Sequence, residues 1–378
     1  NIFLPVGISF FVFQSMSYTI DIYRGQLKPL DNWCDYLFYL SFFPQLVAGP
    51  IVRARDFIPQ IRQNPIVVTR EMFGTGVFLI LTGLFKKAII SDYISLNFVD
   101  RIFDEPLLYS GFECLAGIYG YALQIYCDFS GYSDMAIGIA LLLGFRFPKN
   151  FDAPYKSATI TEFWRRWHIS LSTWLRDYLY ISLGGNRKGK LRTYGNLLIT
   201  MLLGGLWHGA AVRFILWGAL HGVYQIAGDA TDRLRGRGYA ALHVSRTGRL
   251  ACAWQCLCTF ALVNAAWVFF RAASVHDALY VLTAQFRNVS LTGLLADIRA
   301  IAASFNAKSL LSAAFLAFVL LALAGGVLLD CARRFKAPGG DLSARMLSLP
   351  LIFRWLLYYA LAAFIFAGFL MNNGYFAT

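Results

Sequence analysis

One histidine of this chain, His208, has neighbours that suit acid–base chemistry in an apolar setting. It follows Trp207 within the segment Met201-Leu-Leu-Gly-Gly-Leu-Trp-His-Gly-Ala-Ala211. The small residues on both sides let another helix or a slender ligand chain approach the backbone closely. An imidazole held away from water stays neutral and can accept a proton, as a general base must. We therefore take His208 as the first catalytic candidate; the alternative is a buried histidine that only forms a hydrogen bond between helices.

The second candidate, His168, lies in a segment rich in tryptophan and arginine. Aromatic and apolar side chains recur there at helical spacing and predict a single helical stripe, made of Trp164, Trp167, Leu171, Trp174 and Tyr178. Glu162 can pair with Arg166 one helical turn later. The pattern predicts a helix at a membrane interface or around a polar cavity. The alternative is an aromatic-belt helix whose arginines merely reach to the surface.

Other polar groups in apolar segments have plainer explanations. His221 comes one turn after Trp217, and we expect it to form a structural hydrogen bond. Asp128 and Asp134 lie between two predicted apolar helices. We expect them to cap the helix that begins near Ser133; a polar path lined by these carboxylates is the alternative.

The composition indicates what kind of structure must position these residues. Hydrophobic residues make up 58% of the 378 residues and charged residues 15%, whereas soluble domains have about 45–50% and about 25%. A water-soluble globule needs a more polar surface, so we predict an all-α, multi-pass transmembrane protein. Re-entrant or interfacial helices are expected around a central channel. Ionisable groups are costly in hydrocarbon, so His208 and His168 become candidates by elimination.

Apolar stretches of suitable length predict the membrane helices. The candidates are roughly 3–20, 72–91, 112–127, 131–147, 194–211, 213–228, 250–270, 309–329 and 351–371. Residues 33–50 are interrupted by Pro44, Gly49 and Pro50, which predicts a broken or re-entrant segment. No internal repeat or low-complexity linker divides the chain, so a single membrane domain over residues 1–378 is expected.

The net charge of +13 indicates orientation rather than a nucleic-acid partner. Arginine and lysine are dense in 229–249 and 331–349 and sparse in 271–308, so the first two segments are expected to face the cytoplasm. No basic stripe alternates with exposed aromatic residues on a polar segment, as single-strand binding would require.

Several other chemistries find no support in the sequence. The seven cysteines are odd in number and form no CxxC pair, which indicates packing residues rather than a disulfide framework. There is no GxSxG, P-loop, HExxH or GxGxxG motif. His168 and His208 have no clear third ligand, so no metal site is predicted. The chain begins at Asn1 inside an apolar segment without a basic leader, and we expect it to begin partway through a longer protein.

The chain resembles the membrane-bound O-acyltransferase family, in particular its bacterial branch of alginate O-acetyltransferases and related exopolysaccharide-acetylation proteins. The similarity is most specific in the run from Glu162 to Tyr180 and in the Trp207-His208 motif. All matching segments lie within residues 1–228, and the family's further N-terminal helices are absent from the sequence. In order they are Leu4–Phe10, Tyr18–Gly25, Phe43–Pro50, Tyr126–Ala136, Glu162–Tyr180, Leu183–Arg187 and Leu203–Ala210.

The resemblance implies acyl transfer with two site residues. The family's membrane histidine falls on His208, and its second polar site residue falls on His168. Cytoplasmic acetyl-CoA is the implied acyl donor, with no bound cofactor, and the implied location is the lipid bilayer of the bacterial inner membrane. The acetyl group would cross that membrane to a periplasmic partner of the SGNH-hydrolase type. That partner would acetylate an exported polysaccharide of the alginate or cellulose type.

These expectations assign a physical role to each candidate residue. His208 would deprotonate an acceptor hydroxyl that attacks the thioester, or carry the acyl group itself. His168 would orient the acceptor or stabilise the oxyanion. The expected contacts of substrate and donor phosphates are Trp207, Arg165, Arg166 and Arg176. Residues 187–192 are expected either to join them or to form a positive-inside loop.

Two functions of other classes fit the same features less closely. A transporter or flippase would use broken helices and buried histidines to line a translocation path. A non-catalytic scaffold would dock a periplasmic acetyltransferase. Transfer of label from acetyl-CoA separates both alternatives from catalysis.

Overall fold

The chain folds into helices throughout the part described by the computed structural model, which comprises residues 7–286, 291–304 and 346–372. No β-strand occurs among these residues. The all-α prediction is therefore confirmed. The longer helices are α1 (Ile8–Tyr23), α2 (Trp33–Ser41), α3 (Ala54–Ile61), α4 (Arg70–Leu84), α7 (Gly111–Leu142), α10 (Lys190–His208), α11 (Val212–Ala230), α12 (Asp232–Ala241), α13 (Arg249–Arg271), α14 (Val275–Ala284), α15 (Leu291–Ser304) and α18 (Leu351–Asn372).

Three helices in the described ranges are long and apolar enough to cross a membrane. They are Arg70–Asp104, Arg249–Arg271 and Leu351–Gly368, which correspond to the predicted spans 72–91, 250–270 and 351–371. The first continues α4 through the π-helix η2 (Phe85–Ser91), α5 (Asp92–Ile94), η3 (Ser95–Val99) and α6 (Asp100–Asp104). Helices α1, α10 and α11 form at the predicted spans 3–20, 194–211 and 213–228, whereas 309–329 lies outside the described residues.

The predicted spans 112–127 and 131–147 are one helix, not two. Helix α7 runs unbroken through Asp128 and Asp134, and its start is closed by a capping box between Ser110 and Glu113. The expectation that the two aspartates cap a second helix is wrong. Neighbouring lysines instead neutralise them: Lys86 Nζ lies 2.6 Å from Asp134 and Lys87 Nζ lies 2.5 Å from Asp128.

The predicted single stripe over Trp164–Tyr178 is also interrupted. Helix α8 (Ile160–Arg166) ends before Trp167, α9 (Ile169–Trp174) begins after His168, and the π-helical turn η6 (Leu175–Tyr180) follows. Hydrogen bonds to residues 150–152 replace helical ones at the break, as described below. All three tryptophans of the stripe are nevertheless buried.

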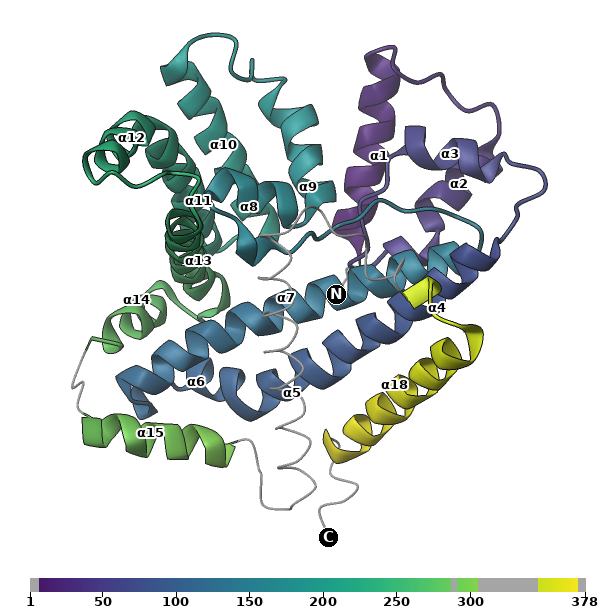
Figure 1. Ribbon diagram of the computed structural model, residues 1–378. Helices are drawn as coiled ribbons and strands as arrows, with labels where there is room; N and C mark the ends of the chain where they lie inside the picture. Colours follow the sequence, from purple (N-terminus) through teal and green to yellow (C-terminus); the bar gives the residue numbers. More distant parts are fainter. Residues whose placement is uncertain (1–6, 287–290, 305–345, 373–378) are drawn as a thin grey trace, which may run out of the picture.

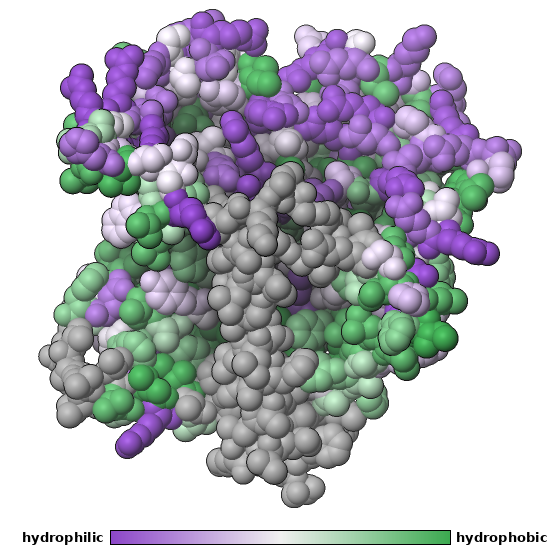
Figure 2. Space-filling view, viewed as in Figure 1, coloured by the Kyte–Doolittle hydropathy of each residue, from purple (hydrophilic) through white to green (hydrophobic). Residues whose placement is uncertain are grey.

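Figure 1 shows how these elements are layered. Helices α4 and α7 cross the molecule side by side, and α8 to α13 stand above one part of α7 while α1 to α3 stand above the other. The main core lies between α7, α8, α11 and α13 and contains Trp164, Trp167, Trp217 and Trp267. Figure 2 shows hydrophilic side chains gathered over the end formed by α12, the start of α10 and α3, with apolar surface below. The arginine-rich segment 229–249 therefore lies at a polar end of the molecule.

The interruption predicted within 33–50 is confirmed. Helix α2 ends at Ser41, and a short 3-10 turn, η1 (Phe43–Gln45), includes Pro44. The non-helical backbone that follows is buried at Ile51 and Val52. Buried irregular backbone of this kind is tolerated at membrane depth because protein groups can satisfy it.

Candidate active site

His208 is the last residue of α10, at the tight corner between α10 and α11. The two helices touch through glycine. A Cβ at Gly205 would lie 2.3 Å from the carbonyl oxygen of Phe214, and a Cβ at Gly218 would lie 2.3 Å from that of Met201. The small residues before His208 thus serve the close helix approach that the sequence predicts.

Aromatic rings surround His208 on several sides. Its ring centroid lies 4.7 Å from that of Trp207, 5.0 Å from that of Phe270 and 5.2 Å from that of Trp217. His208 as a whole residue is half-buried. His208 therefore combines an apolar enclosure with partial exposure of the residue.

His168 occupies the break between α8 and α9 in a conformation that is uncommon for a side-chain-bearing residue. Its φ of 42° and ψ of 56° lie in the left-handed region. The side chain is 2% exposed, and its Nε2 has no hydrogen-bond partner among the described residues. Phe129 packs edge-on against the imidazole at 4.6 Å. Strained backbone and an unpaired buried polar atom concentrate at functional sites.

Backbone hydrogen bonds bracket the break that contains His168. The amide of Asp152 donates to the carbonyl of Arg166, and the amide of Ile169 donates to the carbonyl of Asn150, both at 2.9 Å. We call this pairing of residues 150–152 with residues 166–170 the clasp. Because one bond lies before the Trp167-His168 dipeptide and the other after it, the clasp fixes the backbone on both sides of His168.

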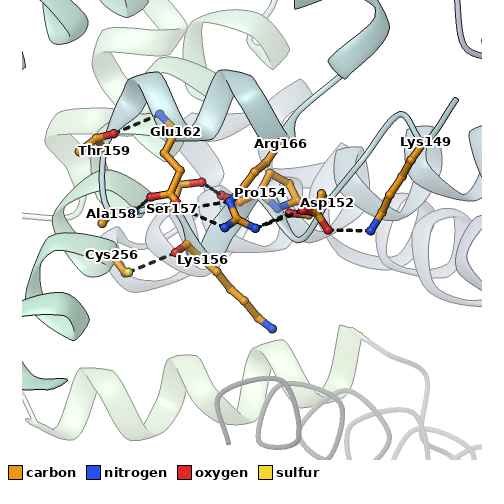
Figure 3. Close-up of polar contacts among 10 residues, drawn as sticks. All are labelled: Lys149, Asp152, Pro154, Lys156, Ser157, Ala158, Thr159, Glu162, Arg166 and Cys256. Atoms are coloured by element: carbon orange, nitrogen blue, oxygen red, sulfur yellow. Dashed lines mark hydrogen bonds and ion pairs between the residues drawn. The ribbon is translucent and has the colours of Figure 1, made fainter. Parts of the chain in front are cut away.

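Side-chain contacts reinforce the clasp (Figure 3). The Arg166 guanidinium donates to Glu162 Oε1 at 3.0 Å and to the carbonyl oxygen of Asp152 at 3.1 Å. The predicted pair of Glu162 and Arg166 is thereby confirmed. On its other side, Asp152 accepts a 2.6 Å hydrogen bond from Lys149, which holds the pKa of the Asp152 carboxyl below its ordinary value.

Helix α1 joins the two histidine-bearing segments. The Phe10 ring lies 6.2 Å from the His168 imidazole and 6.1 Å from the Trp207 indole. One turn on, Phe13 lies 5.0 Å from Trp207 and 4.3 Å from Trp174. Trp207 is in turn the direct neighbour of His208, with ring centroids 4.7 Å apart. The structure thus brings together both predicted catalytic residues and Trp207.

Sequence reasoning missed the part that α1 plays. Its apolar pattern indicated a membrane helix, and nothing in that pattern marked Phe10 or Phe13 as site residues. The one available signal was the match of Leu4–Phe10 to a family motif. Their role follows only from the way α1 packs between residues 168 and 207.

A polar stripe continues along α1 from these aromatic residues. Gln14, Ser17 and Asp21 follow Phe10 at helical spacing and are all buried. Neither amide atom of Gln14 has a hydrogen-bond partner among the described residues, and the same holds for Oδ2 of Asp21. Asp21 Oδ1 accepts a 2.8 Å bond from the hydroxyl of Tyr178. Buried polar atoms without protein partners are suited to water or to a polar ligand.

Arginines gather where this stripe reaches the end of α1. Arg53 pairs with Asp177 at 2.8 Å, and the guanidinium groups of Arg53 and Arg24 lie 5.2 and 5.4 Å from the centre of the Tyr178 ring. Arg176 bonds to Asp177 and remains well exposed. Sequence reasoning named Arg176 but neither Arg24 nor Arg53, which come from elements distant in the chain.

The other two predicted arginines lie elsewhere. Arg165 is exposed on α8, and Arg166 is engaged in the clasp. The arginines named from the sequence therefore do not form one cluster, and their role in donor binding stays a prediction.

His221 has the structural role expected of it. Its side chain is fully buried, and its Nδ1 accepts a hydrogen bond of 3.3 Å from the Trp164 indole. This bond ties α11 to α8. It supports the segment that carries His168 without placing His221 at the reaction centre.

The site thus combines two histidines, an aromatic enclosure and a polar stripe within an all-helical fold of membrane type. Comparison with known proteins identifies the protein family. The chain belongs to the membrane-bound O-acyltransferase family, whose sequence model matches residues 25–275. That range contains His168, His208 and the whole clasp.

Individual relatives narrow the comparison. A protein of Pseudomonas fluorescens described as a probable alginate O-acetylase is 46% identical over 286 residues, which cover 76% of this chain and 55% of that protein. A peptidoglycan O-acetyltransferase of Helicobacter pylori is 40% identical over 307 residues, covering 75% of this chain and 56% of that protein. A teichoic acid D-alanyltransferase of Bacillus subtilis is 31% identical over 239 residues, which cover 59% of this chain and 58% of that protein. The chain spans a little over half the length of each relative.

Proposed function

We propose that this chain is the membrane acyltransferase part of a system that O-acetylates an exported polysaccharide. The observation that carries the proposal is the meeting of His168 and His208 around Phe10 and Trp207. The names of the relatives from Pseudomonas and Helicobacter support acetyl as the group transferred.

In this proposal, His208 is the general base. Its imidazole takes the proton of an acceptor hydroxyl while the oxygen attacks the thioester carbonyl of the donor. The carbon–sulfur bond then breaks, and the leaving thiolate takes the proton back from the imidazole. The aromatic enclosure keeps His208 neutral before each cycle.

His168 stabilises the charge that develops on the carbonyl oxygen. A neutral imidazole carries one N–H donor, and Nε2 of His168 has no hydrogen-bond partner within residues 7–286, 291–304 and 346–372. A donor held in place before the reaction stabilises an oxyanion more effectively than one that must reorganise. The clasp supplies that rigidity.

Acetyl-CoA from the cytoplasm is the proposed donor. Its phosphates would lie near Arg24, Arg53 and Arg176, and its flexible amide-containing arm would follow the polar stripe of α1 towards Phe13. The unpaired amide of Gln14 offers both a donor and an acceptor to such an arm. With the donor bound in this way, the polar end with α12 and the start of α10 would face the cytoplasm from the bacterial inner membrane.

The acceptor side is proposed from the relatives. The acetyl group would pass to a periplasmic partner of the SGNH-hydrolase type and from there to a polysaccharide such as alginate or cellulose. Residues 1–378 would act as one membrane domain in this system.

The direct test uses the full-length protein, purified in detergent or nanodiscs together with its acceptor partner. Radiolabelled acetyl-CoA is supplied, and label on the partner or polymer is measured. Transfer by the wild type and its loss in His208→Ala are expected. Equal transfer by both proteins would refute the catalytic role, and transfer only from an activated D-alanyl donor would refute acetyl as the group.

A further inference from the structure

Helix α9 begins without a cap from its own sequence. Its N-cap residue is His168, and the His168 side chain makes no capping hydrogen bond. The first amides of a helix have no partner within the helix and need one from outside. In α9 that partner is a residue distant in the sequence.

Asn150 supplies acceptors for the first two amides of α9. Its backbone carbonyl accepts from the amide of Ile169 at 2.9 Å, and its side-chain Oδ1 accepts from the amide of Ser170 at 3.1 Å. Oδ1 also accepts from the Ser170 hydroxyl at 2.9 Å. An N-cap residue normally does this from the position before the helix; here Asn150 does it from another segment.

The same asparagine connects three parts of the molecule. Its Nδ2 donates to the hydroxyl of Ser133 on α7 at 3.1 Å, and Ser170 Oγ in turn accepts from the amide of Ile51 at 3.0 Å. Asn150 is 1% exposed, Ser133 is 1% exposed and Ser170 is 7% exposed. Burial shields these bonds from bulk solvent and strengthens them electrostatically.

We propose that Asn150 is a positioning residue for His168. By capping α9 from outside, it allows the residue before the helix to adopt a left-handed conformation and frees the His168 imidazole from a capping role. The imidazole then points towards Phe10 and the reaction centre instead of folding back onto α9. The effect on catalysis rests on the proposed function, whereas the effect on His168 geometry does not.

The experiment compares Asn150→Ala with two matched variants in the full chain. Ser133→Ala removes the acceptor on the α7 side but leaves both bonds that Asn150 Oδ1 accepts from Ser170. Asn264→Ala removes an asparagine of similar burial on α13, whose Nδ2 donates to the carbonyl oxygen of Phe260 in its own helix. Thermal unfolding of each variant reports how much general stability is lost.

The first readout is the rate at which diethyl pyrocarbonate modifies His168. The protein is treated in intact membranes, and the modification is measured by mass spectrometry. In Asn150→Ala the rate should rise at least about fivefold, because local opening becomes more frequent when the cap is lost. In Asn264→Ala it should match the wild type, and in Ser133→Ala it should change less than about twofold. An unchanged His168 rate in Asn150→Ala, or an equal rise in all three variants, overturns the proposal.

The second readout separates positioning from binding. Asn150→Ala should lower kcat about tenfold or more while the KM for acetyl-CoA stays within about twofold. A fall in kcat that parallels the loss of thermal stability in all three variants would mark Asn150 as merely structural. If His168→Ala retains full transfer, the proposed role of His168 fails, and the modification rate still decides whether Asn150 holds it.

Discussion

Gly205 on α10 and Gly218 on α11 face each other so closely that a Cβ on either would lie 3.4 Å from the Cα of the other. The carbonyl oxygens of Phe214 and Met201 lie nearer still, at 2.3 Å from those added Cβ atoms. Backbone cannot yield as a flexible side chain does. This contact therefore sets the corner at which His208 stands.

Gly205→Ala should separate α10 from α11 and lower both stability and transfer. Overpacking of this kind costs about 1–3 kcal/mol. Gly195→Ala on the same helix is the control, because a Cβ at Gly195 meets nothing within 4 Å. That control should gain up to about 1 kcal/mol from higher helix propensity. Thermal unfolding of the purified variants shows whether Gly205→Ala loses stability and Gly195→Ala gains it. Equal stability of the two variants would contradict the close contact.

His208→Ala should retain expression and stability but lose acetyl transfer by about two orders of magnitude or more, because general-base assistance disappears. His276→Ala is the matched control, since His276 is highly exposed on α14. Single-turnover transfer from labelled acetyl-CoA is the measurement. Loss of transfer in His276→Ala as well would point to a general effect of histidine removal.

At position 168, glycine should be tolerated by the fold better than alanine. The left-handed conformation costs an L-residue about 1–2 kcal/mol and costs glycine little. His168→Gly should therefore unfold at a higher temperature than His168→Ala, while both lose transfer. A lower unfolding temperature for the glycine variant would show that position 168 is not held in the left-handed region.

The pair formed by Lys87 and Asp128 should behave as a coupled unit. Lys87→Met leaves both Asp128 and Asp92 without their cation, whereas Asp128→Asn leaves Lys87 paired with Asp92. Both single variants should destabilise the protein, Lys87→Met more than Asp128→Asn, and by no more than about 1 kcal/mol each because the side chains are partly exposed. The double variant should be more stable than the sum of the single changes predicts. The free energy of unfolding is measured for the wild type, both single variants and the double variant, which together form a double-mutant cycle. If the two single effects simply add up in the double variant, the charges act independently.

Acid should weaken the clasp through Asp152. Its folded-state pKa lies below the ordinary value of 3.8, so its stabilising contribution is complete above that value and is lost as the pH falls further. Asp152→Asn should reduce the dependence of the unfolding temperature on pH below about pH 4. The difference should shrink in high salt because the Asp152 side chain is 49% exposed. Identical pH profiles for the two proteins would exclude this role.

The sequence predicted best where the decisive interactions were local. Helical class, the spans 72–91, 250–270 and 351–371, and the pair of Glu162 and Arg166 all follow from periodicity or from one-turn spacing. The continuity of α7 does not, because Asp128 and Asp134 look like a polar break until Lys86 and Lys87 on the adjacent helix neutralise them.

The candidate site was predictable in its residues but not in its arrangement. Both histidines stood out chemically, yet nothing in their own segment required a break at His168. The break depends on Asn150 and Asp152, whose hydrogen bonds cross between segments that only the fold brings together. The contribution of Phe10 depends in the same way on how α1 packs.

The clasp also supplies a spectroscopic reporter. The amides of Asp152 and Ile169 have no helical acceptor, and each is bonded across the clasp instead. Slow hydrogen–deuterium exchange at these two positions would follow the integrity of the junction in a native bilayer, even in a sample that is not turning over. A change in exchange at these amides would then report that ligand binding at the distant polar end affects the reaction centre, and the measurement requires no substitution.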